Sequence, residues 1–131
     1  MLKGHCQCGW VRYEAGDVAS LETMCHCSIC RRTSGAPIVA WFTVPATDFR
    51  FTSGEPARFR SSEHATRSFC PRCGTQLTFH STSSPDEIDI TTCSLEDPEQ
   101  VPPKDHTRTS ARLSWVHLAD GLPSYPEARS G

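Results

Sequence analysis

The sequence predicts a mainly β domain with little helix, in which bound metal supplements a small hydrophobic core. Short runs of alternating polar and apolar residues recur along the chain, as is typical of strands with one wet face. Seven of the eight cysteines fall into three tight clusters. Leu, Ile, Val and Phe make up only about 18% of the 131 residues, and a net charge of -2 argues against disorder.

The strand signals follow one another in chain order. The strongest is the run 37–44, which is rich in β-branched and aromatic residues and long enough for a central strand. Further strands are expected at 11–14, 49–52, 57–60, 66–69, 76–79 and 87–92. Turns rich in Ser, Gly and Pro are expected at 53–56 and 81–86. Helix is expected only as short turns at 28–33 and 94–100.

Length and composition bound the domain organisation. We expect a single zinc domain over residues 1–120 and a polar, proline-bearing tail over 121–131. The N-terminus lacks the apolar run of a signal peptide, and no segment approaches transmembrane length. The expected location is therefore the reducing cytoplasm, without membrane association. Clustered thiols in that compartment favour metal binding over disulfides.

The first and third cysteine clusters share a pattern. Each consists of two closely spaced cysteines, then Gly, then a strand-like run, and each resembles half of a zinc ribbon. The glycine relieves crowding where the backbone folds around sulfur. We predict that four thiolates close one structural zinc site; these ligands are Cys6, Cys8, Cys70 and Cys73. A rubredoxin-like iron site is the alternative, because a Cys-Pro-x-Cys-Gly turn also suits iron.

The middle cluster supplies three thiols, Cys25, Cys27 and Cys30, and predicts a second zinc with an open fourth position. Structural zinc sites are closed, whereas catalytic ones keep a position open. Three thiolates leave this zinc a weak Lewis acid, better suited to deprotonating a small thiol that then attacks an aldehyde. The three cysteines are therefore the predicted catalytic residues. Alternatively a protein ligand closes the site, with His26, His64 and Cys93 as candidates.

Arginines near the thiols could neutralise charge or bind a substrate carboxylate. Arg31 and Arg32 directly follow the triad, and we expect them to bind the ligand in this way. A second group, at residues 58–73, holds four arginines against one Glu. This group leaves open a non-catalytic module, either a glutathione carrier or a nucleic-acid binder that uses Arg58, Arg60, Arg67 and Arg72. The overall negative charge argues against nucleic acid.

Several single residues carry weaker signals. Cys93 is expected to be a small buried residue rather than a ligand. His64 and His106 are expected in loops, on the surface or behind the site. Trp41 and Trp115 are expected in the core or in the wall of a pocket.

Taken together, these motifs resemble the glutathione-dependent formaldehyde-activating enzyme (GFA) family, whose domain is shared with centromere protein V. The resemblance covers residues 3 to about 118. It rests on Gly4-x-Cys6-x-Cys8-Gly9-x-Val11, Cys25-x-Cys27-x-x-Cys30-Arg31, Phe69-Cys70-x-x-Cys73-Gly74 and Ser94-Leu95-Glu96-Asp97-Pro98, in that order.

The resemblance implies a β-tent of two zinc-ribbon-like halves, a structural zinc on the first and third clusters, and a labile catalytic zinc on the second. It also implies carbon–sulfur lyase activity, with glutathione and formaldehyde as the family's substrates. The chain looks shorter than the formaldehyde-activating enzymes proper. A lyase acting on a thiol–aldehyde adduct is therefore the expected function, with S-(hydroxymethyl)glutathione as one such substrate and a homodimer compatible with the sequence.

Overall fold

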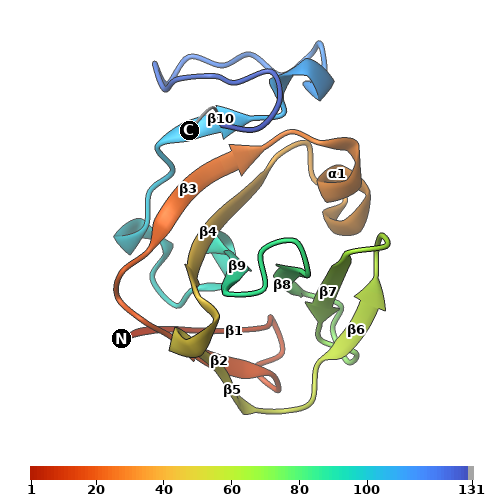
Figure 1. The fold of residues 1–131 in the computed structure, drawn as a ribbon, viewed down its shortest axis with the longest axis vertical. Helices are drawn as coiled ribbons and strands as arrows, with labels where there is room; N and C mark the ends of the chain where they lie inside the picture. The colour runs from red at the N-terminus through yellow and green to blue at the C-terminus, as the bar shows by residue number, and fades with distance from the viewer. Residues whose placement is uncertain (130–131) are drawn as a thin grey trace.

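A computed structural model describes residues 1–129 and confirms a mainly β fold (Figure 1). A three-stranded antiparallel sheet has the order β1 (Leu2–His5), β2 (Arg12–Ala15) and β5 (Phe49–Ser53). A seven-stranded sheet has the order β10 (Asp105–Thr107), β3 (Ser20–Cys25), β4 (Val39–Pro45), β9 (Glu87–Thr91), β8 (Gln76–Ser81), β7 (Ala65–Phe69) and β6 (Ala57–Arg60). Within the second sheet, β10 is parallel to β3 and the other neighbours are antiparallel.

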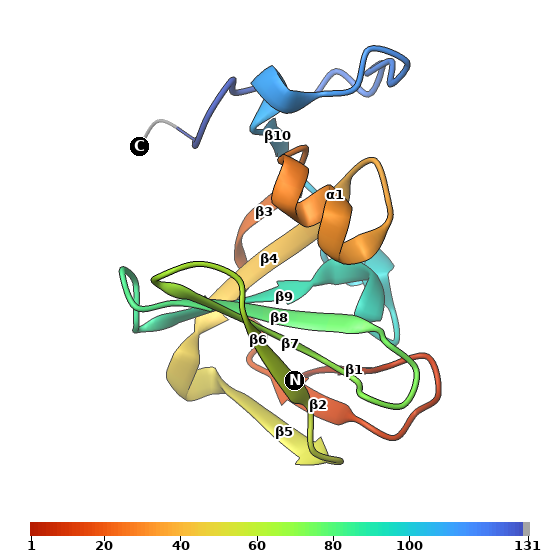
Figure 2. The same ribbon diagram turned by 90° about the vertical axis from the view of Figure 1, so that its right-hand side faces the viewer.

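Helical structure is short, as expected. The turn expected at 28–33 is α1 (Ser28–Ser34), and the stretch 94–100 contains a 3₁₀ turn. The 3₁₀ turns are η1 (Ala46–Asp48), η2 (Thr92–Ser94), η3 (Pro98–Gln100) and η4 (Thr109–Ala111). In Figure 2, α1 lies above β8 and β9 of the larger sheet, and the C-terminal segment lies above α1.

The two sheets pack against each other through a shared core. Phe42 and Val44 of β4 and Ile90 of β9 are fully buried against Tyr13 and Leu2 of the smaller sheet. Because side chains alternate along a strand, the residues between them point to the opposite face of the larger sheet. That second face is free of the core, and it forms the floor of the cavity described below.

A close approach between the strands of the smaller sheet explains one glycine. Gly4 pairs with Tyr13 across β1 and β2, and the Tyr13 hydroxyl bonds Ser94 Oγ at 2.6 Å. A Cβ at Gly4 would lie 2.2 Å from that hydroxyl oxygen, which is closer than packed atoms can come. The glycine therefore lets the buried Tyr13 ring cross β1.

The C-terminal segment pairs with β10 through its backbone. Tyr125 N–H donates to His106 O at 2.9 Å, and Arg108 N–H donates to Glu127 O at 2.8 Å. The Arg129 guanidinium forms an ion pair with the buried Asp105. Residues 121–129 thus lie along the larger sheet's edge, whereas residues 130–131 of the expected tail lie outside the described residues. A domain boundary at residue 120 stays a prediction.

Candidate metal centres

The first and third cysteine clusters meet in space. The sulfur atoms of Cys6, Cys8, Cys70 and Cys73 all lie within 4.8 Å of one another. The Sγ–Sγ distances are 3.5 Å from Cys6 to Cys8 and 3.8 Å from Cys8 to Cys70. Four thiolates at a Zn–S distance of about 2.3 Å in tetrahedral geometry stand roughly 3.8 Å apart. The four donors therefore fit one metal ion of zinc's size.

Two similar turns build this cluster. Cys6 N–H donates to Val11 O, and Cys70 N–H donates to Thr75 O, both at 3.0 Å. Gly9 and Gly74 have φ of +80° and +83°, which only glycine adopts readily. A backbone N–H also points at a sulfur in each turn, from Val11 to Cys6 at 3.3 Å and from Arg72 to Cys70 at 3.4 Å. These N–H groups stabilise thiolates.

The four-thiol cluster lies apart from the large cavity; two of its cysteines are buried, and the other two, Cys8 and Cys73, are exposed. Cys6 and Cys70 are fully buried with Val11 and Leu77 in a small core between the two sheets. Its fourth position is filled by a cysteine, and none of the four cysteines lines the large cavity. Hydrogen bonds from Thr75 lower the pKa of the Cys73 thiol to about 5. The arrangement suits a structural ion that joins the N-terminal turn to the middle of the chain.

The middle cluster is built from the end of a strand and the start of a helix. Cys25 ends β3, Cys27 is the N-cap of α1, and Cys30 lies in the helix's first turn. The Cys27 sulfur accepts the Cys30 backbone N–H at 3.2 Å, and Gly35 ends the helix in the left-handed conformation. The three sulfur atoms lie within 4.8 Å of one another. The C-x-x-C spacing thus places an N-cap and a first-turn residue side by side.

The three thiols do not titrate alike. Hydrogen bonds from the Cys25 thiol, and then from the Cys30 thiol, lower the pKa of Cys27 to about 2. The pKa of Cys25 rises far above its usual range, mainly through the Cys27 and Cys30 sulfurs and then through burial. One thiolate is therefore favoured without metal, while a cation must displace the other protons.

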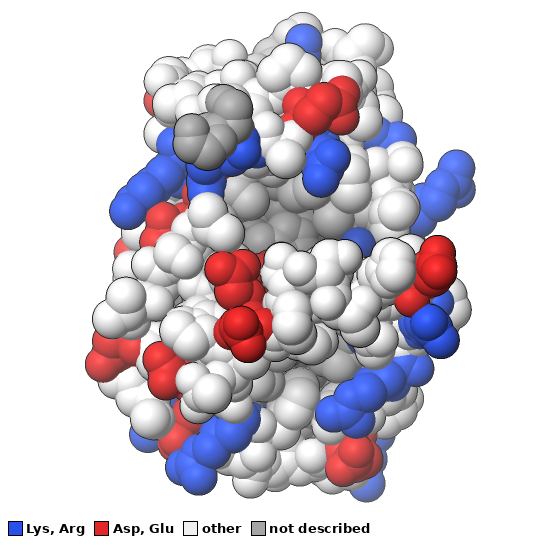
Figure 3. All heavy atoms as spheres, in the orientation of Figure 1, with Lys and Arg blue, Asp and Glu red and all other residues white. Residues whose placement is uncertain are grey.

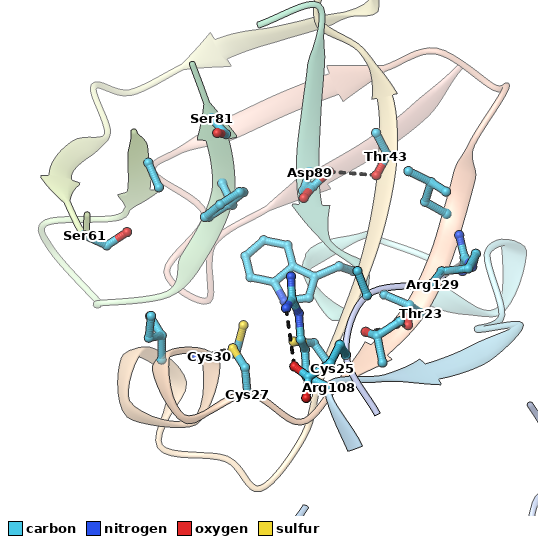
Figure 4. A pocket seen from close by; sticks show the side chains of 18 of the residues that line it. Thr23, Cys25, Cys27, Cys30, Thr43, Ser61, Ser81, Asp89, Arg108 and Arg129 are labelled. Carbon is cyan, nitrogen blue, oxygen red and sulfur yellow. Dashed lines mark hydrogen bonds and ion pairs between the residues drawn. The ribbon is translucent and has the colours of Figure 1, made fainter. Parts of the chain in front are cut away.

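The triad faces a cavity of about 840 Å³, a volume typical of small-molecule sites. The free face of the larger sheet forms one wall, and the start of α1 and the C-terminal segment form others. Figure 3 shows the hollow near the centre of this face, and Figure 4 shows Cys27 and Cys30 at its edge. Among the described residues, no fourth His, Cys, Asp or Glu joins the three thiols.

Arg67 on β7 places its cationic side chain against the triad. Its side chain is buried, its Nη2 lies 3.9 Å from Cys30 Sγ, and the guanidinium lies over the rings of Phe79 and Trp41. Within residues 1–129, Arg67 forms no ion pair with a carboxylate. A buried cation needs a compensating charge, which ionised thiols bound to a dication would supply. In the sequence, the only signal for Arg67 was that it is one of four arginines within residues 58–73.

A buried chain of hydrogen bonds lies on the other side of the triad's loop. His26 Nε2 is 2.9 Å from His106 Nδ1, and His106 Nε2 is 2.7 Å from the Asp120 carboxylate. Since Asp120 accepts from His106 Nε2–H, His106 Nδ1 accepts from His26 Nε2–H. Burial lowers the pKa of His26 and keeps it neutral. The structure places His26 in this chain, not among the thiols. His106 lies behind the site, one of the two places expected for it, but it is buried on β10 rather than in a loop.

Other predicted residues fall in several places. Arg31 donates to Ala111 O at 2.6 Å, and it lines a separate shallow groove together with Arg32. Neither residue lines the cavity that the triad faces, and a ligand-binding role for them stays a prediction. Trp41 is buried in the cavity wall as expected, but Trp115 is 65% exposed and lies at the edge of that groove.

Two further expectations concern a thiol and a surface. Cys93 is exposed, so the expectation that it is buried is wrong. It lies in η2, the turn after β9, and its side chain points outward there. His64 is exposed as expected. The four arginines that the alternative would use to bind nucleic acid do not form one exposed surface, because Arg67 is buried.

A mainly β fold with a four-thiol cluster away from the cavity and a three-thiol cluster open to it defines a protein whose cysteines are arranged to hold metal ions. The family model of the glutathione-dependent formaldehyde-activating enzyme matches residues 1–111. The chain belongs to this family.

One solved structure is similar over nearly the whole chain. It is the crystal structure of a Rhodobacter sphaeroides protein, a structural genomics target, with 26% sequence identity and a TM-score of 0.60. The match covers 94% of this chain and 98% of the other. No curated protein sequence matches significantly. Among the described residues, no helix has the length and apolar character needed to cross a membrane.

Proposed function

We propose that the protein is a zinc-dependent carbon–sulfur lyase or synthase acting on a small thiol–aldehyde adduct, such as S-(hydroxymethyl)glutathione, in the cytoplasm. The observation that carries the proposal is the contrast between the two clusters. Four thiols are closed off from the cavity, whereas three thiols line it and have no fourth protein donor among the described residues. An open position beside a cavity is what a metal needs to accept a substrate.

In the proposed reaction the thiol sulfur forms a bond to the aldehyde carbon. The carbonyl π electrons move to oxygen, which takes up the proton that the thiol loses, and lysis is the reverse. A zinc ion on Cys25, Cys27 and Cys30 would keep the substrate thiol deprotonated. Arg67 stands against Cys30 and is suited to stabilising negative charge on the reacting oxygen.

The surroundings of the triad favour this reaction. Trp41 and Phe79 give the cavity apolar surface beside the thiols, which strengthens electrostatic interactions within it. Arg67 is fixed by hydrogen bonds to Gln76 at 3.0 Å and Ser61 at 3.3 Å, so its position does not depend on the ligand. A preorganised cation of this kind is worth more than a mobile one.

Exchange between glutathione and formaldehyde, measured by NMR, tests the proposal. We expect the zinc-loaded protein to accelerate the exchange, and Cys27→Ser to abolish the acceleration. Cys93→Ser is the matched control, because Cys93 is an exposed thiol outside both clusters and should be neutral. If the zinc-loaded protein does not accelerate exchange for glutathione or for other small thiols, the protein is a non-catalytic zinc-binding module instead.

A further inference from the structure

Asp89 is a carboxyl group in the cavity wall that the proposed chemistry does not use. It lies on β9 in a row of paired residues that crosses the free face of the sheet, between Thr43 of β4 and Phe79 of β8. Thr43 Oγ1–H donates to Asp89 Oδ1 at 2.7 Å. Figure 4 shows this bond, with the carboxyl group facing the cavity.

The carboxyl group lacks a cationic partner. Asp89 takes part in none of the ion pairs within residues 1–129, and only Thr43 bonds to it. Burial raises the pKa of Asp89, and Glu87 on the same strand acts in the same direction. Thr43, His80 and Arg67 oppose the rise without reversing it. A half-buried carboxylate of this kind gains most from a cation brought by a ligand.

We propose that Asp89 binds a primary ammonium group of the thiol substrate, and that the cavity therefore selects thiols with a free amino end. The inference rests on the proposed function, because it requires the substrate's sulfur to lie at the triad.

The spacing between the two ends of the cavity limits the ligand's length. Val39 pairs with Cys25, and Thr43, which bonds Asp89, lies four residues further along β4. At about 3.3 Å per residue the backbone rows of Cys25 and Asp89 stand roughly 13 Å apart, and the side chain of Arg67, which shares the row of Asp89, reaches the triad. A thiol that bridges the triad and Asp89 needs several bonds between its sulfur and its amino group, as a small peptide thiol has.

Calorimetric binding of two thiols to the zinc-loaded protein tests the ammonium site. We expect glutathione to bind about 10- to 100-fold more tightly than N-acetylglutathione, the range expected for a charge-assisted hydrogen bond. Asp89→Asn keeps an acceptor for Thr43 but removes the charge. It should weaken glutathione binding by the same factor and leave N-acetylglutathione unchanged. Asp86→Asn, at an exposed position outside the cavity lining, is the matched control and should change neither.

The outcomes separate the two proposals. If both thiols bind equally and both are turned over, the ammonium site is wrong while the lyase function stands. If acetylation weakens binding equally in the wild type and in Asp89→Asn, the amino group binds elsewhere and the assignment to Asp89 is overturned. If neither thiol binds or reacts, both proposals fall. The comparison of two ligands on the wild-type protein needs no variant, so a folding defect in Asp89→Asn cannot obscure it.

Discussion

The guanidinium of Arg67 lies 3.9 Å from the Cys30 sulfur, inside the protein and without a carboxylate partner among the described residues. A triad of thiolates around a dication carries one net negative charge, which the Arg67 cation balances. The two groups therefore depend on each other electrostatically. This contact links β7 with the start of α1, so a change at Arg67 should alter the charge balance of the open site.

Arg67→Met should weaken zinc binding at the triad selectively. Met retains much of the buried volume but removes the charge, and loss of a group that supports metal ligands typically lowers affinity about 10- to 100-fold. Competition with a chromogenic chelator measures the affinity of each site. Arg58→Met is the control, because Arg58 lies on the exposed edge strand. Equal zinc affinity in Arg67→Met and wild type would contradict the electrostatic coupling.

Chelation should remove two ions in two stages. The triad lines a cavity and offers only three sulfurs, so it should lose its ion first with little change in fold, whereas the other cluster offers four sulfurs, two of them on fully buried cysteines. Loss of the second ion should unfold the domain, because structural zinc contributes on the order of 10 kcal/mol to folding. Metal content and circular dichroism, followed together during titration, measure both stages. Unfolding in step with loss of the first ion would refute the division of roles.

Spacing in the sequence predicted both thiol clusters, because short C-x-C and C-x-x-C segments bring sulfurs together whatever the rest of the fold does. The strands with β-branched or aromatic residues were also predictable. β3 was not, since only half of its residues are apolar and it contains Leu21 at φ +52° beside an irregular register, so that simple alternation is lost. β10 owes its conformation to a parallel partner far away in sequence.

The residues that line the cavity were harder still to predict from the sequence. Arg31 and Arg32 adjoin the triad in sequence, but they follow it on α1 and line another groove. Arg67 and Asp89 lie far from it in sequence, yet sheet pairing through Phe79 places both on the cavity face. Sequence proximity is a poor guide here because a helix turns successive side chains in different directions, whereas a sheet aligns distant residues on one face.

Gly4→Ala should destabilise the protein by about 1–3 kcal/mol, the usual cost of overpacking. The added methyl group would overlap the Tyr13 ring, which is fully buried and cannot move without disturbing the core between the sheets. Lys3→Ala, at the exposed neighbouring position, should have little effect. Urea unfolding at fixed zinc concentration measures the difference. Gly4→Ala should cost less stability when it is added to Tyr13→Leu, which has a smaller side chain at position 13, than when it is added to the wild type.

Asp89→Asn should stabilise the ligand-free protein at neutral and alkaline pH. Burial raises the pKa of Asp89 in the folded state, so the native protein binds this proton more tightly than the unfolded chain does. Wild-type stability therefore falls as pH rises from the unfolded pKa of about 3.9 through the raised folded value. Asn carries no charge, so its advantage, on the order of 1 kcal/mol, should appear above this window and vanish below it.

Thermal unfolding of both proteins at several pH values measures this difference, with Asp86→Asn as the exposed control. A substitution that stabilises the fold and yet weakens binding of an amino-bearing thiol would identify Asp89 as a group retained for ligand binding. Equal stability of wild type and variant across the pH range would show that the Asp89 carboxylate is already compensated in the free protein. The driving force assigned above to ammonium binding would then be absent.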